Sequence, residues 1–251
     1  SKERQCTKET YKKDIEKIKS VIEQYCVDNN SRVLIPSFSL DRTPYILWIL
    51  YSLFGKDENF KIPILIDSPL ANRLLDCYSS ILEGDKKELF DEMMSWKNIQ
   101  RVIQPEASKA AIADKCAKVI LSSSGMLTAG RSVKWTQSIL LKENDCILFM
   151  GYSGQDTLAW KIKHGKDNKT ININGKPYKN KAQIYDLKSF SSHMQRIDML
   201  NYYKSINCEK IYLVHGDSNK IEFKHDLENA ITDCLKSTKV VAVNNGTKIS
   251  L

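Results

Sequence analysis

A parallel β-sheet covered by helices on both faces, an α/β fold, is predicted from two observations. Short apolar runs that suit buried strands alternate along the chain with longer stretches in which apolar residues recur at three- and four-residue steps. Strands and helices that alternate in this way are typical of parallel sheets, because each parallel connection needs a crossover. The chain has 251 residues, of which 42% are hydrophobic, so it is long enough for one large domain or two small ones.

The elements of the predicted sheet follow one another from the start of the chain. A helix is expected near residues 11–25, where Tyr11, Ile15 and Ile18 begin a one-sided apolar pattern. Buried strands are expected at residues 32–36, 62–66, 119–121 and 146–150, and helices at 44–54, 71–82, 132–141 and from 157 onward. Pro44 occupies the first position of the second helix in this prediction, and Gly55 ends that helix.

A change in sequence character near residue 171 predicts a second region. Asn174-Gly175 between β-type residues indicates a hairpin with a type I′ turn. We expect a domain boundary just after Asp186, which divides the chain into residues 1–187 and 188–251. Beyond it, helices are expected at 194–203 and 221–235, and strands at 211–214, 240–243 and 248–251, the last two joined by a turn at Asn245-Gly246.

The composition limits the classes of partner and compartment. A formal net charge of +8 favours a polyanionic partner, although a lysine-rich proteome would give the same excess. Seven cysteines are scattered without a CxxC pair, so we expect reduced thiols, mostly in the core. No apolar run approaches the ~18 residues that a membrane span needs, and the charged N-terminus is unlike a signal peptide. These observations predict a cytoplasmic protein with no membrane partner.

Two loops that follow predicted strands contain polar groups that a plain core does not require. Residues 37–43 and 122–131 each lie between a strand and the start of a helix, where backbone N–H groups and the helix dipole attract anions. Candidate phosphate-binding residues in these loops are Ser37, Arg42, Thr43, Ser123, Ser124, Gly125, Gly130 and Arg131. Taken alone, an ordinary capping loop or a glycine-dependent turn also explains the two stretches.

Two of the four histidines occupy positions at the predicted carboxyl edge of a sheet. His193 opens a predicted helix, and His215 directly follows a predicted strand. A neutral imidazole there can ligate zinc or move a proton, although a capping or hydrogen-bonding role is the commoner use of such a residue. Lys163 and the other two histidines, His164 and His225, are expected to be solvated surface residues.

Taken together and in order, these stretches resemble the β-CASP family of metallo-β-lactamase-fold nucleases. The similar motifs are IPSFSLDRT at residues 35–43, IPILIDSPLA at 62–71, SSSGMLTAGRS at 122–132 and GYSGQDTL at 151–158. The segment SFSSH, which ends at His193, resembles the family's motif B, and LVHGD around His215 resembles its motif C. The resemblance covers about residues 30–251, and its six motifs occur in the family's order.

The resemblance implies a β-CASP domain followed by the C-terminal portion of a metallo-β-lactamase αββα fold. It also implies a parent enzyme that hydrolyses RNA with two zinc ions, because His at motif C is typical of the RNA-processing branch and Val of the DNA-processing branch. Carried over by position, His193 is the general acid or a transition-state contact near the scissile phosphate, and His215 is a ligand of the second zinc. The RNA-contacting set then gains Tyr152, Thr157 and Ser192.

The chain departs from the family pattern at several positions. Asp41 and Asp156 stand where glycine is usual, and Asp217 where Glu is usual. Because no His-x-His-x-Asp-His motif occurs, we expect an excised piece of a longer enzyme, inactive alone, whose partner is a missing N-terminal lactamase half. The alternative that the chain is a non-catalytic RNA-binding or assembly module stays open. Whether the chain forms a homodimer, and whether the parent cleaves RNA internally or from an end, also stays open. An unrelated Rossmann-like enzyme is disfavoured, because residues 37–43 contain no glycine.

Overall fold

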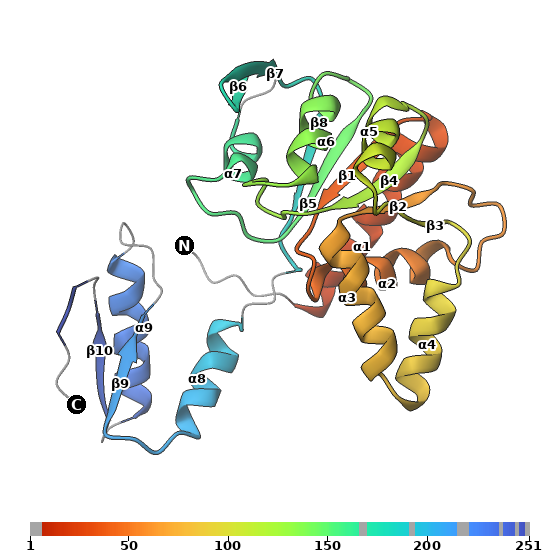
Figure 1. Cartoon of the computed structure of the whole chain (residues 1–251). Helices are drawn as coiled ribbons and strands as arrows, with labels where there is room; N and C mark the ends of the chain where they lie inside the picture. Colours follow the sequence, from red (N-terminus) through yellow and green to blue (C-terminus); the bar gives the residue numbers. More distant parts are fainter. Residues whose placement is uncertain are drawn as a thin grey trace. The chain divides into compact units, whose positions relative to one another are not determined.

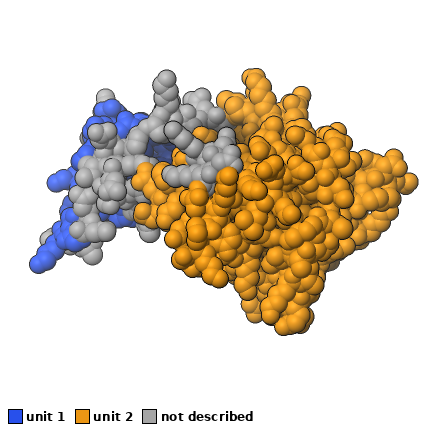
Figure 2. Space-filling model, turned by 90° about the horizontal axis from the view of Figure 1, so that it is seen from above, with its two compact units in different colours: residues 1–5, 192–251 blue, residues 6–191 orange. Residues whose placement is uncertain are grey.

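The computed structural model describes residues 7–165, 170–190, 194–214, 221–235, 238–243 and 246–248. Its Cα packing separates two compact units, of which the larger comprises residues 6–191 and the smaller contains the residues from 192 onward (Figure 2). Both units combine helices with parallel strands. The domain division expected between residues 187 and 188 stays a prediction.

The larger unit is built on a six-stranded sheet whose neighbouring strands are all parallel (Figure 1). In spatial order the strands are β3 (Ile99–Arg101), β2 (Ile64–Asp67), β4 (Lys118–Ser122), β1 (Arg32–Pro36), β5 (Cys146–Met150) and β8 (Gln183–Leu187). The predicted α/β fold and its strands at β1, β2, β4 and β5 are confirmed. These four strands are buried along their whole length, whereas β3 and β8, which the sequence analysis missed, contain exposed residues.

Helices cover both faces of this sheet, as predicted. One face packs against α1 (Lys8–Ile22), which continues as the π-helical segment η1 (Glu23–Asp28), and against α2 (Arg42–Phe54), α3 (Pro69–Ile81) and α4 (Gly84–Met94). The other face packs against α5 (Pro105–Ala113), α6 (Arg131–Ile139) and α7 (Leu158–Lys163). Side chains alternate between the two cores, since Val33 and Ile35 lie in the first and Leu34 in the second. Pro44 is the third residue of α2 rather than its first, because α2 begins at Arg42.

Asn174 and Gly175 turn a hairpin that packs on the second core. Its strands β6 (Thr170–Ile173) and β7 (Lys176–Lys179) are antiparallel, and the two turn residues have φ of 52° and 79°. Positive φ at both positions is what a type I′ turn requires, so the predicted hairpin is confirmed. The two buried isoleucines of β6 join the second core.

The smaller unit pairs two parallel strands through a helix. Its described elements are α8 (Arg196–Lys204), β9 (Lys210–Leu213), α9 (Ile221–Cys234) and β10 (Lys239–Ala242). Leu213, Ile231 and Val240 form its buried core. These predicted helices and strands are confirmed, with bounds that shift by a residue or two, while the strand predicted at 248–251 lies largely outside the described residues.

The cysteines are less buried than the sequence analysis predicts. All six whose placement is described are free thiols; Cys26 and Cys146 are buried, whereas Cys77, Cys116 and Cys234 are exposed. The expectation that most lie in the core is therefore wrong, because the exposed thiols occupy solvent-facing positions on α3, on α9 and in the loop before β4. Within the described residues no helix is long and apolar enough to cross a membrane.

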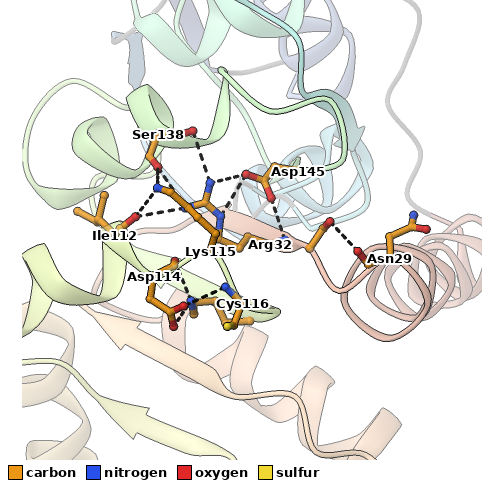
Figure 3. A network of polar contacts seen from close by, with 10 residues as sticks. Asn29, Arg32, Ile112, Asp114, Lys115, Cys116, Ser138 and Asp145 are labelled. Atoms are coloured by element: carbon orange, nitrogen blue, oxygen red, sulfur yellow. Dashed lines mark hydrogen bonds and ion pairs between the residues drawn. The ribbon is translucent and has the colours of Figure 1, made fainter.

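A buried ion pair lies at the amino edge of the sheet, where the strands begin (Figure 3). Arg32, the first residue of β1, forms a salt bridge with Asp145, and its Nε donates to Asp145 Oδ2 at 3.1 Å. The backbone N–H of Arg32 donates to Asp145 Oδ1 at 3.0 Å. Arg32 Nη1 and Lys115 Nζ both donate to the carbonyl of Ile112 and the hydroxyl of Ser138. The buried guanidinium therefore has an acceptor at each of its three nitrogens.

Candidate functional site

The loops that follow β1, β2, β4 and β5 meet at the carboxyl edge of the sheet. All four strands are parallel, so their final residues lie side by side and the chain leaves each of them in the same direction. Hydrogen bonds then tie the loops to one another: the backbone N–H of Ser37 donates to the carbonyl of Ser122 at 3.0 Å. This edge brings both predicted phosphate-binding stretches together.

Three serine hydroxyls form a continuous chain across this edge. Ser39 Oγ lies 2.8 Å from Ser123 Oγ and 3.2 Å from Ser68 Oγ, so the hydroxyl chain Ser68–Ser39–Ser123 links the loops after β2, β1 and β4. Ser68 Oγ also accepts from the backbone N–H of Ala71 and thereby caps α3. Two bonds between three hydroxyls leave one O–H able to donate, which suits an anionic oxygen. Ser123 is one of the predicted phosphate-binding residues, whereas Ser39 and Ser68 were not predicted, although both lie within the β-CASP-like motifs of the sequence.

The buried hydroxyls of Ser37 and Thr43 stabilise the loop after β1 by hydrogen bonds within it. Their hydroxyl oxygens lie 3.1 Å apart, and Thr43 Oγ1 donates to the carbonyl of Phe38 at 2.9 Å. Both residues are buried, with exposed fractions of 2% and 1%. Their predicted contact with phosphate stays a prediction, and the observed contacts are with the loop itself.

A strained turn presents Arg42 at the start of α2. Asp41 has φ 61° and ψ −50°, and the N–H of Arg42 donates across it to the carbonyl of Leu40 at 2.6 Å. This is a γ-turn of the positive-φ kind, which is rare for a residue with a side chain. Burial lowers the pKa of the Arg42 guanidinium from its ordinary value, and the nearby Asp41 and then Tyr45 oppose that shift.

The loop from residue 123 to 130 is held in shape by Ser124 and Gly130. Ser124 Oγ accepts from the backbone N–H groups of Thr128 and Ala129, at 3.0 and 3.4 Å. Gly130 has φ 83°, and a Cβ there would lie 2.6 Å from the carbonyl oxygen of Ser123, so this position requires glycine. The predicted contact of Gly130 with phosphate stays a prediction.

Arg131 is engaged by a buried carboxylate. Its Nη1 donates to Asp67 Oδ1 at 2.6 Å and to the carbonyl of Val102 at 2.9 Å, and its Nη2 donates to the carbonyl of Ile103 at 2.6 Å. Asp67 is fully buried, and its other oxygen accepts from Ser108 and Trp135. Arg131 thus fastens α6 to the ends of β2 and β3, and its predicted direct contact with phosphate stays untested.

The loop after β5 carries Tyr152 and Thr157. Tyr152 is 43% exposed, and Thr157 caps α7 by accepting from the N–H of Trp160. The N–H of Ala159 donates to the carbonyl of Met126 at 3.2 Å, which joins this loop to the loop after β4. Gly125, the remaining predicted position in that loop, packs against Phe38.

Lys163 is buried, so its predicted solvent exposure is wrong. Only 4% of its side chain is exposed, because Nζ lies over the ring of Phe149, 5.0 Å from its centroid, and reaches the carbonyl of Gly151 at 2.6 Å and Asp186 at 2.8 Å. His164 and His225 are exposed, as predicted.

The predicted RNA-binding residue Ser192, the predicted general acid His193 and the predicted zinc ligand His215 lie outside the described residues. The chain that leads to the first two is firmly packed: Phe190 is 2% exposed and contacts the rings of Tyr11 and Tyr45. The N–H of Ser189 donates to Asp14 Oδ2 at 3.0 Å. Ser189 and Phe190, the first two residues of the SFSSH motif, are therefore fixed on α1 and α2.

Comparison with family models defines the class of this protein. Residues 43–162 match the Beta-Casp domain, and residues 177–233 match the Zn-dependent metallo-hydrolase RNA specificity domain. The chain therefore carries these two domains of the metallo-β-lactamase RNA nucleases, and it is distantly homologous to the β-CASP ribonucleases over most of its length.

Similar curated proteins belong to bacteria, archaea and eukaryotes. Ribonuclease TTHA0252 of Thermus thermophilus is 27% identical over 84% of this chain and 49% of its own length. Transcription termination factor FttA of Methanocaldococcus jannaschii is 29% identical, over 77% of this chain and 32% of its own length. Endoribonuclease ysh1 of Schizosaccharomyces pombe is 25% identical, over 78% and 26%. The chain thus spans about half of the first relative and about a third or less of the other two.

Proposed function

We propose that this chain forms the RNA-binding part of a zinc-dependent ribonuclease and positions the strand for cleavage. The observation that carries the proposal is the hydroxyl chain Ser68–Ser39–Ser123, which joins three loops at the edge of the β-CASP sheet. Hydroxyl and backbone N–H groups at such an edge can donate to phosphate oxygens. The description of the second domain as an RNA specificity domain supports RNA as the substrate.

The site residues have two kinds of role in this proposal. Ser123, Arg42 and Tyr152 face the RNA, since they combine hydroxyl, guanidinium and exposed aromatic groups at one edge, and the buried Ser39 bonds to the Ser123 hydroxyl from below. The remaining described residues hold the loops in shape, and these are Ser37, Thr43, Ser124, Gly125, Gly130, Arg131 and Thr157. Beyond the described residues, Ser192 contacts the RNA, His193 acts as the general acid and His215 binds zinc.

Zinc is proposed for the parent enzyme rather than for the described residues. In the part of the chain that the structure describes, no three His, Cys, Asp or Glu side chains lie close enough to hold a metal ion. Catalytic zinc sites use about three protein ligands per ion. The described residues therefore do not fit a zinc pair by themselves, and His215 would need partner ligands from an N-terminal lactamase half.

RNA affinity at two salt concentrations tests the proposed binding site. Arg42→Ala should weaken binding of a labelled single strand and reduce the slope of log affinity against log salt by about 0.7, the value for one lost phosphate contact. Lys86→Ala, which removes an exposed charge on α4, is the matched control and should have a smaller effect. Equal losses in both variants would mean that diffuse charge alone binds the strand.

Cleavage by the chain itself tests its place in the enzyme. Labelled RNA incubated with the chain and zinc should stay intact, while metal analysis of the same sample should find less than one zinc ion per chain. Turnover with stoichiometric zinc would contradict the proposal that the metal site needs a second half. RNA binding without cleavage, in a parent protein that also fails to cleave, would favour the alternative of a non-catalytic RNA-binding or assembly module.

A further inference from the structure

Phe38 exposes an aromatic ring in the middle of the polar carboxyl edge. The residue is 45% exposed, while its neighbours Ser37 and Ser39 are buried, so the loop turns its hydroxyls inward and its ring outward. No other aromatic ring among the described residues pairs with it. Single exposed apolar side chains are common on protein surfaces, so the case for a ligand rests on how this ring is held and on what surrounds it.

Phe38 is held in place at its backbone carbonyl and at one edge of its ring. The backbone N–H and the hydroxyl of Thr43 both donate to the carbonyl of Phe38, at 3.1 and 2.9 Å. A Cβ at Gly125 would lie 3.2 and 3.3 Å from Cδ2 and Cε2 of the ring, so the missing side chain at Gly125 provides the space in which one ring edge rests. The ring is thus fixed against a glycine loop while nearly half of the residue faces solvent.

The surroundings of the ring suit a nucleotide better than an apolar protein surface. Ser39, the next residue, belongs to the hydroxyl chain with Ser123, and Arg42 begins the helix that follows. A fixed aromatic ring beside hydroxyl donors and a guanidinium can bind both parts of a nucleotide, the base by stacking and the phosphate by hydrogen bonds. A protein partner that covered this ring would also have to satisfy the surrounding polar groups.

We infer that Phe38 is a stacking platform for one base of the bound RNA, next to the phosphate held at the hydroxyl chain. The inference rests on the proposed function, because it requires RNA at the carboxyl edge. Stacking on a ring accepts every base, so the platform sets the position of the strand and favours purines, which have the larger π-face. Phe38 is then a positioning residue that fixes which phosphate lies beside the hydroxyl chain.

Short single-stranded RNA carrying 2-aminopurine tests the platform, since stacking quenches the fluorescence of this base. The chain should quench it at one position of the strand, and an abasic site at that position should weaken binding. Phe38→Ala should remove the quenching and lower affinity by roughly 5- to 100-fold, the range for loss of one base–aromatic stack. Phe38→Trp should keep the quenching and the affinity. Leu40→Ala, which shortens a neighbouring side chain that is 61% exposed, should change neither the quenching nor the affinity.

The outcomes separate this inference from the proposed function. If the unaltered chain binds no RNA, the proposed function fails and the platform fails with it. If the chain binds RNA but Phe38→Ala and the abasic strand bind as well as the originals, the platform alone is overturned. Thermal unfolding of each variant shows whether it is folded, and the Phe38→Trp result then distinguishes lost stacking from a disturbed loop.

Discussion

The two edges of the sheet both contain a buried aspartate paired with an arginine, yet they differ in everything around the pair. At the amino edge, Arg32 and Asp145 bond to each other, and Arg32 also donates to Ser138 (Figure 3). At the carboxyl edge, Arg131 and Asp67 support loops that expose Phe38 and carry the hydroxyl chain. The same kind of ion pair therefore lies in a structural network at one edge and beneath the loops of the proposed binding surface at the other.

Positive φ is more frequent at the carboxyl edge than at the amino edge. It occurs at Asp41, Leu127, Gly130 and Gly151 in loops that leave the carboxyl edge, and at Asn30 just before β1 at the amino edge. Strained backbone persists where the surrounding structure holds it, and it concentrates at sites of binding and catalysis. We therefore expect more strain in the loops of the carboxyl edge.

The largest expected effect comes from breaking the amino-edge pair. Asp145→Ala leaves the buried Arg32 guanidinium without its carboxylate, so the free energy of unfolding should fall by about 3–5 kcal/mol. Urea denaturation measures this change in the free energy of unfolding. The RNA affinity of the folded protein should stay unchanged, and an altered affinity would show that this edge also takes part in binding. Adding Arg32→Met should restore part of the loss, because no unpaired charge then remains.

The matching change at the carboxyl edge should affect both properties. Asp67→Asn replaces an oxygen that accepts from Ser108 and Trp135 by an amide donor, and it weakens the ion pair with Arg131. The free energy of unfolding should fall by about 2–3 kcal/mol, as for loss of hydrogen bonds to a charged group. RNA affinity should fall as well, because the loops lose their anchor. A loss of stability alone would make this pair as purely structural as the pair at the amino edge.

The buried thiols near the amino edge predict a loss of stability at high pH. Burial raises the pKa of Cys26 to about 12 and the pKa of Cys146 well above its ordinary value near 9. Unfolding then releases these protons, so the stabilising effect is complete below pH 9 and is lost as the pH rises toward 12. The slope should reach about 1.4 kcal/mol per pH unit for each thiol. Urea denaturation at pH 8 and 10 should show less decrease in Cys26→Ala than in the exposed control Cys77→Ala.

The smallest expected effect concerns the strained turn at Asp41. Asp41→Gly should raise the free energy of unfolding by about 1 kcal/mol, because glycine accepts positive φ without steric conflict. It should also strengthen RNA binding by removing a negative charge beside Arg42. Asp41→Asn separates the two effects, since it removes the charge and keeps a side chain at the strained position. If Asp41→Gly lowers stability, the γ-turn is not the source of strain at this edge.

The central part of the fold was predictable because its strands are buried on both faces. Continuous apolar runs such as Val33–Ile35 occur only where helices cover both sides of a sheet, so β1, β2, β4 and β5 were found from the sequence. The strands β3 and β8 are the two outermost strands of the sheet. They were missed because exposed positions in such strands take polar residues, such as Gln100 and Arg101 in β3. The helix α5 was missed because it is rich in alanine and buries little beyond Ser108.

The location of the candidate site was predictable, but the direction of its side chains was not. Parallel strands bring their final residues to one edge, which is why the loops at 37–43 and 122–131 meet as expected. Which side chains turn outward depends on hydrogen bonds between loops far apart in sequence. Ser37 faces inward and Phe38 outward for that reason, and Arg131 turns to a carboxylate that precedes it by 64 positions.

The position of a bound acceptor determines the direction of the hydrogen bonds in the hydroxyl chain. Each serine has one hydrogen to donate, and Ser39 cannot donate to both Ser68 and Ser123 at once. An acceptor at the Ser123 end therefore requires Ser68 to donate to Ser39 and Ser39 to donate to Ser123, while an acceptor at the Ser68 end requires the reverse order. An acceptor bound at one end thus fixes the donors of all three serines and leaves the opposite end able only to accept. In the remaining arrangement Ser68 and Ser123 both donate to Ser39, and the free hydrogen lies on Ser39 itself.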